Sequence, residues 1–197
     1  AGILLTAAVV LGASISQTQK QIRTLVQNYM LSSAEDTGTI MDTMLGIEGD
    51  AMLTDADELS RILSGVKVEG MTSSYSYLVS SDGTMLYHPT ADKIGSPVEN
   101  EVVTGLVADL KNGKIAEPAC VRYEFKGAVK YAAYYINPNG SFILVVSADE
   151  ADAFHAVTQT RNTLAGILLA ILVVFTVAGV ALIRRLIRPL HTLTGVV

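Results

Sequence analysis

Uncharged, almost wholly apolar residues run without a break from Leu164 to Ile183. A helix of that length, at about 1.5 Å rise per residue, crosses the roughly 30 Å hydrocarbon layer of a bilayer. A buried helix of a soluble protein normally shows a polar stripe within two turns, and this segment shows none. Arg184, Arg185 and Arg188 follow at once, and loops with several basic residues beside a span stay in the cytoplasm. The pattern therefore predicts a membrane span with everything upstream outside the cell.

A shorter apolar segment occupies the amino-terminal end. Residues 1–15 carry no charge and are apolar apart from two hydroxyl residues and glycines. We expect a first span that is truncated, because the chain begins with Ala1 and no basic region precedes the apolar run. A signal peptide cleaved near Ser14 is an alternative that the sequence leaves open. With two spans both ends are cytoplasmic, and residues 16–161 form one exterior domain.

Helical periodicity opens the exterior domain. No proline interrupts residues 16–45, and apolar residues recur there at spacings of three and four, which predicts one long helix. Its glutamine-rich face suits either solvent or the same helix of a second copy, so homodimerisation and ordinary packing both stay open. A second, short helix is predicted with Thr54 as N-cap, Asp57 at its third position, and Leu59 and Leu63 on its apolar face.

Beyond Gly70 the apolar period changes from that of a helix to that of a strand. Apolar and polar residues alternate, and the turn pairs Asp82-Gly83 and Lys126-Gly127 each join two extended segments. These features predict two hairpins and one further strand. We expect strands over residues 75–79, 84–88, 120–125, 128–136 and 141–146.

A helix is also predicted between the hairpins. Ser96, Pro97 and Glu99 have the pattern of a capping box with proline at the first helical position, and apolar residues continue to Leu110. Residues 149–161 predict a last helix that runs into the second apolar segment. The resulting fold class is α+β, a PAS-like five-stranded antiparallel sheet with a long N-terminal helix, flanked by two transmembrane helices.

Several segments carry a family resemblance. Residues 77–89 (YLVSSDGTMLYHP), followed five residues later by Ile-Gly, resemble the signature of Cache domains. Residues 123–127 and 133–142 are similar to the later hairpin and final strand of that family, with phenylalanine at the end where most members carry tryptophan. Residues 188–193, with Arg-Pro-Leu and a later leucine, resemble the opening of a HAMP linker. The likeness covers about residues 16–197.

The resemblance implies a single-Cache transmembrane receptor, most often a methyl-accepting chemotaxis protein. Residues 1–15 and 162–183 would be its spans, residues 16–161 its extracytoplasmic sensor and residues 184–197 its HAMP start. Such a protein lies in the cell membrane, binds a small organic molecule and signals to a cytoplasmic kinase and adaptor through the region beyond residue 197. A membrane histidine kinase or a cyclic-dinucleotide enzyme with the same sensor is the alternative.

Charge and composition exclude other classes. Residues 20–161 carry a net charge of −8 and the last 14 residues carry +3, so the exterior domain lacks the basic face that nucleic acid requires. Cys120 is the only cysteine, which excludes an internal disulfide. No GxSxG, HExxH or Walker-type segment is present, so we expect no enzyme, cofactor or metal site. An adhesion module with an empty pocket remains a further alternative.

Candidate ligand-binding residues come from the resemblance, which places a small ligand between the concave face of the sheet and the loops after its second strand. His88 ends that strand and could donate to a carboxylate, or its ring nitrogen could cap the loop backbone. Tyr75, Tyr77 and Tyr134 are candidates because their hydroxyls could orient an acid while their rings exclude water.

Two cations in the facing strands are further candidates. Arg122 and Lys130 would need an anion if buried, since an unpaired buried charge is costly, and a small organic acid would supply one. Alternation puts Lys130 and Tyr134 on one face of the sheet and Tyr131 on the other, without indicating which face is concave. The alternative partners are protein carboxylates: Glu117, Glu124 or Asp149.

Overall fold

The computed structural model describes residues 2–191, with side chains at positions 12, 16–154, 166–167 and 169–182. The chain divides into two compact units, Ala1–Phe154 and His155–Val197. The expected HAMP start lies outside the described side chains, and residues 192–197 lie outside the described residues altogether.

Two long helices begin and end the chain. Helix α1, Gly2–Glu48, contains both the first apolar segment and the long helix expected after it, without a break. Helix α4, Glu150–His191, likewise joins the expected last helix to the second apolar segment. Among the side chains that the structure describes, which leave gaps in both of these helices, no helix is long and apolar enough to cross a membrane.

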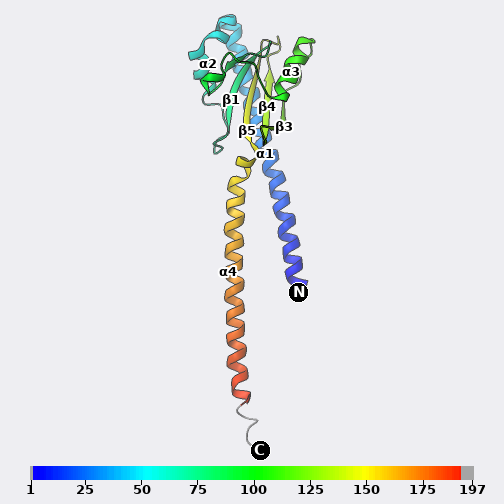
Figure 1. Ribbon diagram of the computed structural model, residues 1–197, viewed down its shortest axis with the longest axis vertical. Coiled ribbons are helices and arrows are strands. Elements are labelled where there is room, and N and C mark those ends of the chain that lie inside the picture. Colours follow the sequence, from blue (N-terminus) through cyan, green and yellow to red (C-terminus); the bar gives the residue numbers. More distant parts are fainter. Residues whose placement is uncertain (1, 192–197) are drawn as a thin grey trace, which may run out of the picture. The chain divides into compact units, whose positions relative to one another are not determined.

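The expected five-stranded antiparallel sheet is confirmed (Figure 1). Its strands lie in the order β2-β1-β5-β4-β3, so the last strand of the chain is at the centre. Strand β5 continues to Asp149, beyond its expected end, because Ser147 pairs with Tyr75 of β1 and Asp149 pairs with Lys130 of β4. The strands are β1 (Tyr75–Ser80), β2 (Met85–Tyr87), β3 (Ala119–Phe125), β4 (Ala128–Ile136) and β5 (Phe142–Asp149).

Strand alternation gives the sheet two buried faces. Helix α1 and helix α2 (Ala56–Leu63) cover one face, where Tyr131 and Leu144 are fully buried. Helix α3 (Glu101–Lys111) covers part of the other face, where it packs on Ile143 and Val145. Each fully buried aliphatic side chain contributes about 1.5–3 kcal/mol through its removal from water. The alternation predicted for β4 is confirmed, since Tyr134 lies on the α3 face and Tyr131 on the α1 face.

Both internal helix starts differ from the sequence prediction. The N-cap of α2 is Asp55, whose Oδ1 accepts from the backbone N–H of Glu58 at 3.0 Å, whereas Thr54 ends a short 3-10 helix. The N-cap of α3 is Asn100, not Ser96. The carbonyl of Ser96 instead accepts from the N–H of Met85, and the N–H of Val98 donates to the carbonyl of Gly83. These bonds to a neighbouring segment hold residues 96–98 extended, so no helix begins there.

Candidate functional site

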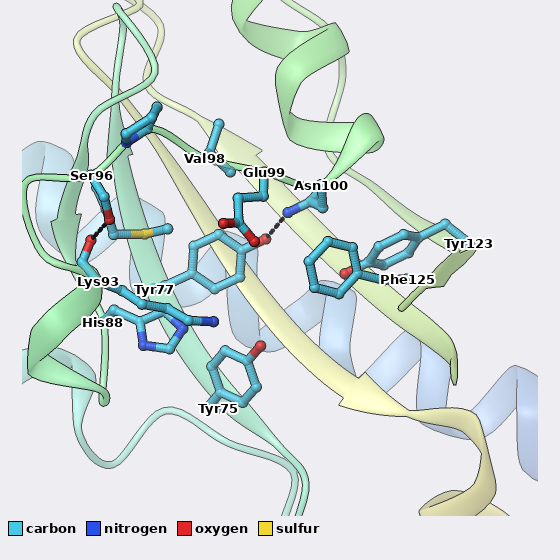
Figure 2. A pocket seen from close by; sticks show the side chains of 12 residues that line it. Tyr75, Tyr77, His88, Lys93, Ser96, Val98, Glu99, Asn100, Tyr123 and Phe125 are labelled. Atoms are coloured by element: carbon cyan, nitrogen blue, oxygen red, sulfur yellow. Dashed lines mark hydrogen bonds between the residues drawn. The ribbon is translucent and has the colours of Figure 1, made fainter. Parts of the chain in front are cut away.

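A small pocket of about 60 Å³ lies on the α3 face of the sheet, between β1, β2 and β3 and the segment that precedes α3 (Figure 2). A wider, open groove of about 480 Å³ lies at the turns around Asp82, Lys111 and Asn139. We place the site in the smaller pocket, because aromatic rings and buried polar groups converge there. Its lining consists of Tyr75, Tyr77, Met85, His88, Lys93, Ser96, Pro97, Val98, Glu99, Asn100, Tyr123 and Phe125.

The segment over the pocket, residues 93–100, is fastened to β2 by backbone hydrogen bonds. The N–H of Met85 donates to the carbonyl of Ser96 at 2.9 Å, and the N–H of Gly95 donates back to the carbonyl of Met85 at 2.8 Å. Gly95 has φ = 81°, a conformation that favours glycine. The bonds hold residues 93–100 beside the sheet, so the pocket wall is positioned before any ligand arrives.

Asn100 sets the direction of one pocket hydroxyl. Its Oδ1 accepts from the backbone N–H of Val103 at 2.9 Å, which caps α3 and leaves the amide nitrogen to donate to Tyr77 Oη at 2.8 Å. Both Asn100 and Tyr77 are buried, and burial raises the pKa of Tyr77 well above its usual range, so the hydroxyl stays protonated. Because the oxygen accepts from Asn100, its own proton is left to donate elsewhere.

His88 provides a second neutral donor. The backbone N–H of Thr90 donates to His88 Nδ1 at 2.9 Å, as the backbone-capping alternative anticipated. Burial and then the nearby Lys93 lower the pKa of His88 from 6.5, so the ring is neutral at pH 7. With Nδ1 accepting, the single ring proton lies on Nε2. The ring packs against Tyr75 and Tyr77, with centroids 5.2 and 5.9 Å away.

Lys93 and Glu99 bring the charges of the pocket. Glu99 is bound by Lys126, 2.8 Å away, which lowers the pKa of that carboxyl. Lys93 forms no ion pair with any carboxylate among the described residues, and Figure 2 shows its side chain extending beside His88. The pocket thus combines the exposed Lys93 ammonium, the Glu99 carboxylate that Lys126 binds, and two neutral donors. Its Lys93 and His88 end is suited to a small anion.

The structure brings together three of the six residues predicted from the sequence. Tyr75, Tyr77 and His88 line the pocket. The other three lie elsewhere and do not line it: Arg122, Lys130 and Tyr134.

Each of those three residues has other contacts. Arg122 lies on the α1 face and binds Glu150 through two hydrogen bonds, of 3.1 and 2.8 Å. Lys130 lies on the pocket face but is paired with Asp149, one of the alternatives that the sequence left open. Tyr134 is buried in the core beside α3.

Cys120 is half-buried, and burial raises its pKa to about 12, so its thiol is unreactive. Among the described residues no cluster of histidine, cysteine or acidic side chains could hold a metal ion.

Sequence reasoning missed most of the segment over the pocket. The sequence prediction omits Glu99 and Asn100 because Ser96, Pro97 and Glu99 have the pattern of a capping box and predict a helix start. It omits Lys93 because that residue lies in the polar loop before Ser96. The signal that could have found Asn100 is local: asparagine followed by Glu101 is also a good N-cap with an acid in the first turn. Tyr123 and Phe125 gave no signal, because strand alternation alone does not identify the pocket face.

No protein-family model and no curated protein matches the chain. Solved structures with a similar fold include one described as the structural basis for carboxylic acid recognition by a Cache chemosensory domain. It shares 15% identity over 66% of this chain and 97% of that one, with a TM-score of 0.46. The E. coli DcuS sensor domain shares 15% identity over 66% of this chain and 90% of its own, with a TM-score of 0.40.

The ligand binding domain of Mlp24 with asparagine shares 19% identity over 52% of this chain, with a TM-score of 0.38. This chain spans 38% of that domain and 37–39% of several further sensor domains. Similarity at this level does not identify a ligand for this chain, so the ligand is inferred from the geometry of its own pocket.

Proposed function

We propose that the domain of residues 16–161 binds a small carboxylate and is the extracytoplasmic sensing region of a bacterial transmembrane chemoreceptor of the single-Cache type. One observation carries the proposal: the unpaired Lys93 beside His88 in an aromatic pocket. Lys93 is exposed, so water solvates its ammonium, and a carboxylate that enters the pocket would replace part of that water with a charge-assisted hydrogen bond.

The donors suit a carboxylate. Its two oxygens can accept from the Lys93 ammonium and from a neutral donor, either Tyr77 Oη–H or His88 Nε2–H. Tyr75 and Phe125 add ring surface that excludes water and strengthens these bonds. The volume of about 60 Å³ has room for only a few heavy atoms, which favours a short-chain acid.

A binding role suits the pocket better than catalysis. Tyr77, Tyr123 and His88 have pKa values shifted in the direction that keeps each group neutral, which favours hydrogen bonding over proton transfer. Among the described residues no serine or cysteine is hydrogen-bonded to the His88 ring as an activated nucleophile would be, and Nδ1 is occupied by the Thr90 backbone amide. The domain therefore senses its ligand without converting it.

The membrane part of the proposal has two supports. Large apolar side chains of α4 between Ile167 and Leu182 are exposed, Phe175 at 73%, and an exposed apolar surface of this kind favours contact with lipid or another chain. Arg184, Arg185 and Arg188 follow that surface, the arrangement of a cytoplasmic exit. In this proposal the two spans are residues 1–15 and 162–183.

Homodimerisation through α1 is part of the proposal. Leu25, Tyr29, Ile40 and Ile47 are exposed by 50–80%, and at 3.6 residues per turn they fall within about 60° of one another around the helix. Asp36 is the charged residue that falls within the same stripe, and the other residues of the stripe suit a second copy of the helix. A HAMP segment that begins at residue 184 would pass the signal to a cytoplasmic kinase and adaptor, or, in the alternative, to a histidine kinase or cyclic-dinucleotide output.

A melting screen of the purified full chain tests the proposal. Formate, acetate, propionate, lactate and pyruvate are compared with acetamide and propionamide, which have nearly the same size without the charge. A ligand that binds only the folded state adds about 2.7 kcal/mol at a hundredfold excess over its Kd, which raises Tm by roughly 5–10 °C for a chain of this length. Carboxylates with no effect, or amides with the same effect, would overturn the proposal.

Two variants locate the binding. Lys93→Met keeps the length of the side chain and removes its charge, so the carboxylate shift is lost while the unliganded Tm changes little. Arg122→Met removes a cation of the opposite sheet face and serves as the control. Its unliganded Tm falls because Glu150 loses two hydrogen bonds, but its carboxylate shift is retained.

A further inference from the structure

Two carboxylate side chains in the first turn of α4 bind different parts of the domain. Glu150 is the first residue of this helix and Asp152 is the third. Glu150 forms an ion pair with α1 and accepts hydrogen bonds from β3 and β4, whereas Asp152 accepts from the segment that leads into β1. Both carboxyl groups have a lowered pKa, Glu150 chiefly because of Arg122 and Asp152 chiefly because of Ser73.

The contacts of Glu150 join α4 to the α1 side of the sheet. Arg122 of β3 donates to both carboxylate oxygens, Arg23 of α1 lies 3.0 Å from Oε1, and Tyr131 Oη donates to the same oxygen at 2.6 Å. The Glu150 side chain is only 12% exposed, so these charge-assisted bonds are poorly screened by water. Arg23 also lies over the ring of Phe154, 5.8 Å from its centroid.

The contacts of Asp152 join the same turn to the pocket side. Its Oδ2 accepts from the Ser73 backbone N–H at 2.9 Å and from the Ser73 hydroxyl at 3.0 Å. Thr72 Oγ1 donates to the same atom at 3.2 Å, and Ser73 Oγ accepts from the backbone N–H of Asp149. Ser73 therefore bridges the end of β5 and the start of α4.

A pocket residue lies two positions after that bridge. Tyr75 begins β1, lines the pocket, and has Ser147 of β5 as its register partner. Only Ser74 separates Tyr75 from Ser73, and Ser74 is itself fixed, because its hydroxyl accepts from the Val68 N–H at 2.8 Å. A displacement of Tyr75 therefore has a short covalent path to the Asp152 contacts.

We propose that Asp152 and Glu150 are positioning residues that couple the pocket to α4. The position of Tyr75 in the pocket wall determines the geometry of the Ser73–Asp152 hydrogen bonds. These bonds in turn hold the first turn of α4 where Glu150 makes its contacts. As a route for a signal, this inference rests on the proposed function. The coupling itself can be tested without a ligand, because each of its contacts joins residues of this chain.

Amide hydrogen exchange on the full chain tests the coupling without a ligand, so its failure is separate from a failure to find a carboxylate. Tyr75→Ala removes the pocket wall that leads to Ser73, and Phe125→Ala removes a wall of the same pocket on β3. Exchange in residues 150–154 is read at the amides of residues 153 and 154, because the first N–H groups of a helix have no helical acceptor. It rises about tenfold in Tyr75→Ala, the scale of losing one hydrogen bond to a charged group, and stays at the wild-type rate in Phe125→Ala.

Two further variants calibrate the result. Asp152→Asn keeps the shape of the side chain and removes its charge, and it raises exchange in both residues 72–75 and residues 150–154. Asp82→Asn is the matched control, because Asp82 also accepts from a serine hydroxyl and a backbone N–H but lies in the β1–β2 turn. It leaves exchange in residues 150–154 unchanged.

The proposal is overturned if Tyr75→Ala leaves residues 150–154 at the wild-type rate, or if Phe125→Ala raises exchange there equally. Exchange in residues 131–136 of β4 reports on the core. If exchange in residues 131–136 also rises in Tyr75→Ala, the milder Tyr75→Leu is compared with Phe125→Leu. Local coupling raises exchange in residues 150–154 in Tyr75→Leu alone, whereas general destabilisation raises it in both variants and overturns the proposal.

Discussion

Asn100 Nδ2 donates to Tyr77 Oη across 2.8 Å, and this single contact joins the cap of α3 to the floor of the pocket. The amide is oriented by its other end, which accepts from Val103. Since the Tyr77 oxygen is used as an acceptor, the hydroxyl proton is directed away from Asn100. The same side chain that caps α3 therefore orients a donor for the ligand.

Tyr77→Phe removes both the acceptor for Asn100 and the donor for the ligand. The variant leaves the buried Asn100 amide without its acceptor, which costs about 1–3 kcal/mol, and it removes a donor from the pocket. We expect a lower Tm together with weaker carboxylate binding. Tyr134→Phe is the control, because Tyr134 shares the sheet face but does not line the pocket. A Tyr77→Phe chain with unchanged Tm and unchanged affinity would contradict the assignment.

Gly38 lets α1 approach the sheet closely. A Cβ at this position would lie 2.2–2.7 Å from ring atoms of Tyr135, whose hydroxyl donates to Asp42 of the same helix. The ring is held at both ends and cannot move away, so Gly38→Ala destabilises the fold by about 1–3 kcal/mol.

Gly46→Ala is the matched control in the same helix. A Cβ there meets nothing within 4 Å, so alanine stabilises the helix by up to about 1 kcal/mol. Thermal melting of the two variants should move Tm in opposite directions. Equal effects would show that α1 does not rest on Tyr135.

The lowered pKa of His88 predicts a pH dependence. The folded chain keeps His88 neutral to a lower pH than the unfolded chain, whose value is 6.5. The contribution of the neutral His88 ring to the free energy of unfolding is therefore complete above about pH 6.5. It is lost as the pH falls through the lowered pKa that His88 has in the folded chain. The five carboxyl groups with lowered pKa titrate at lower pH, since their ordinary values are 4.5 or 3.8.

Comparison with His88→Asn isolates this effect. The asparagine oxygen can replace Nδ1 as the acceptor for Thr90 but does not titrate. The Tm difference between wild type and His88→Asn should shrink as the pH is lowered from 7.5 to 5.5. A difference that is constant across this range would mean that His88 is protonated to the same extent in both states.

Dimerisation through α1 is testable by cross-linking. In a Cys120→Ala background, Leu25→Cys and Tyr29→Cys place a thiol on the exposed stripe, and Ile115→Cys places one at a comparably exposed site outside it. Mild oxidation should give a covalent dimer with the first two and little with the third. Equal cross-linking at Ile115 would remove α1 as the interface.

The strands were the most predictable part of the fold. Alternation over β4 and the Asp82-Gly83 and Lys126-Gly127 turns are local signals, and a local signal suffices for a hairpin. The start of α3 was not predictable in the same way. Ser96 has the pattern of a cap, but its carbonyl is bound by Met85, a contact between separate segments that no local pattern reports.

The site was only partly predictable for the same reason. His88 and Tyr77 were found because they belong to a recognisable segment, whereas Lys93 follows in a polar loop that resembles any other. Arg122 was a plausible anion ligand only as long as its partner was unknown. Its pairing with Glu150, 28 residues away in the sequence, depends on how β3 lies beside the start of α4.

The most direct test of carboxylate binding observes His88 itself. In the full chain labelled with 15N-histidine, the His88 Nε2 resonance is assigned by its absence in His88→Asn and followed during titration with acetate and propionate. The account predicts a saturable shift with at least one acid, absent with propionamide and lost in Lys93→Met. No saturable shift with either acid, or the same shift with the amide, would contradict it.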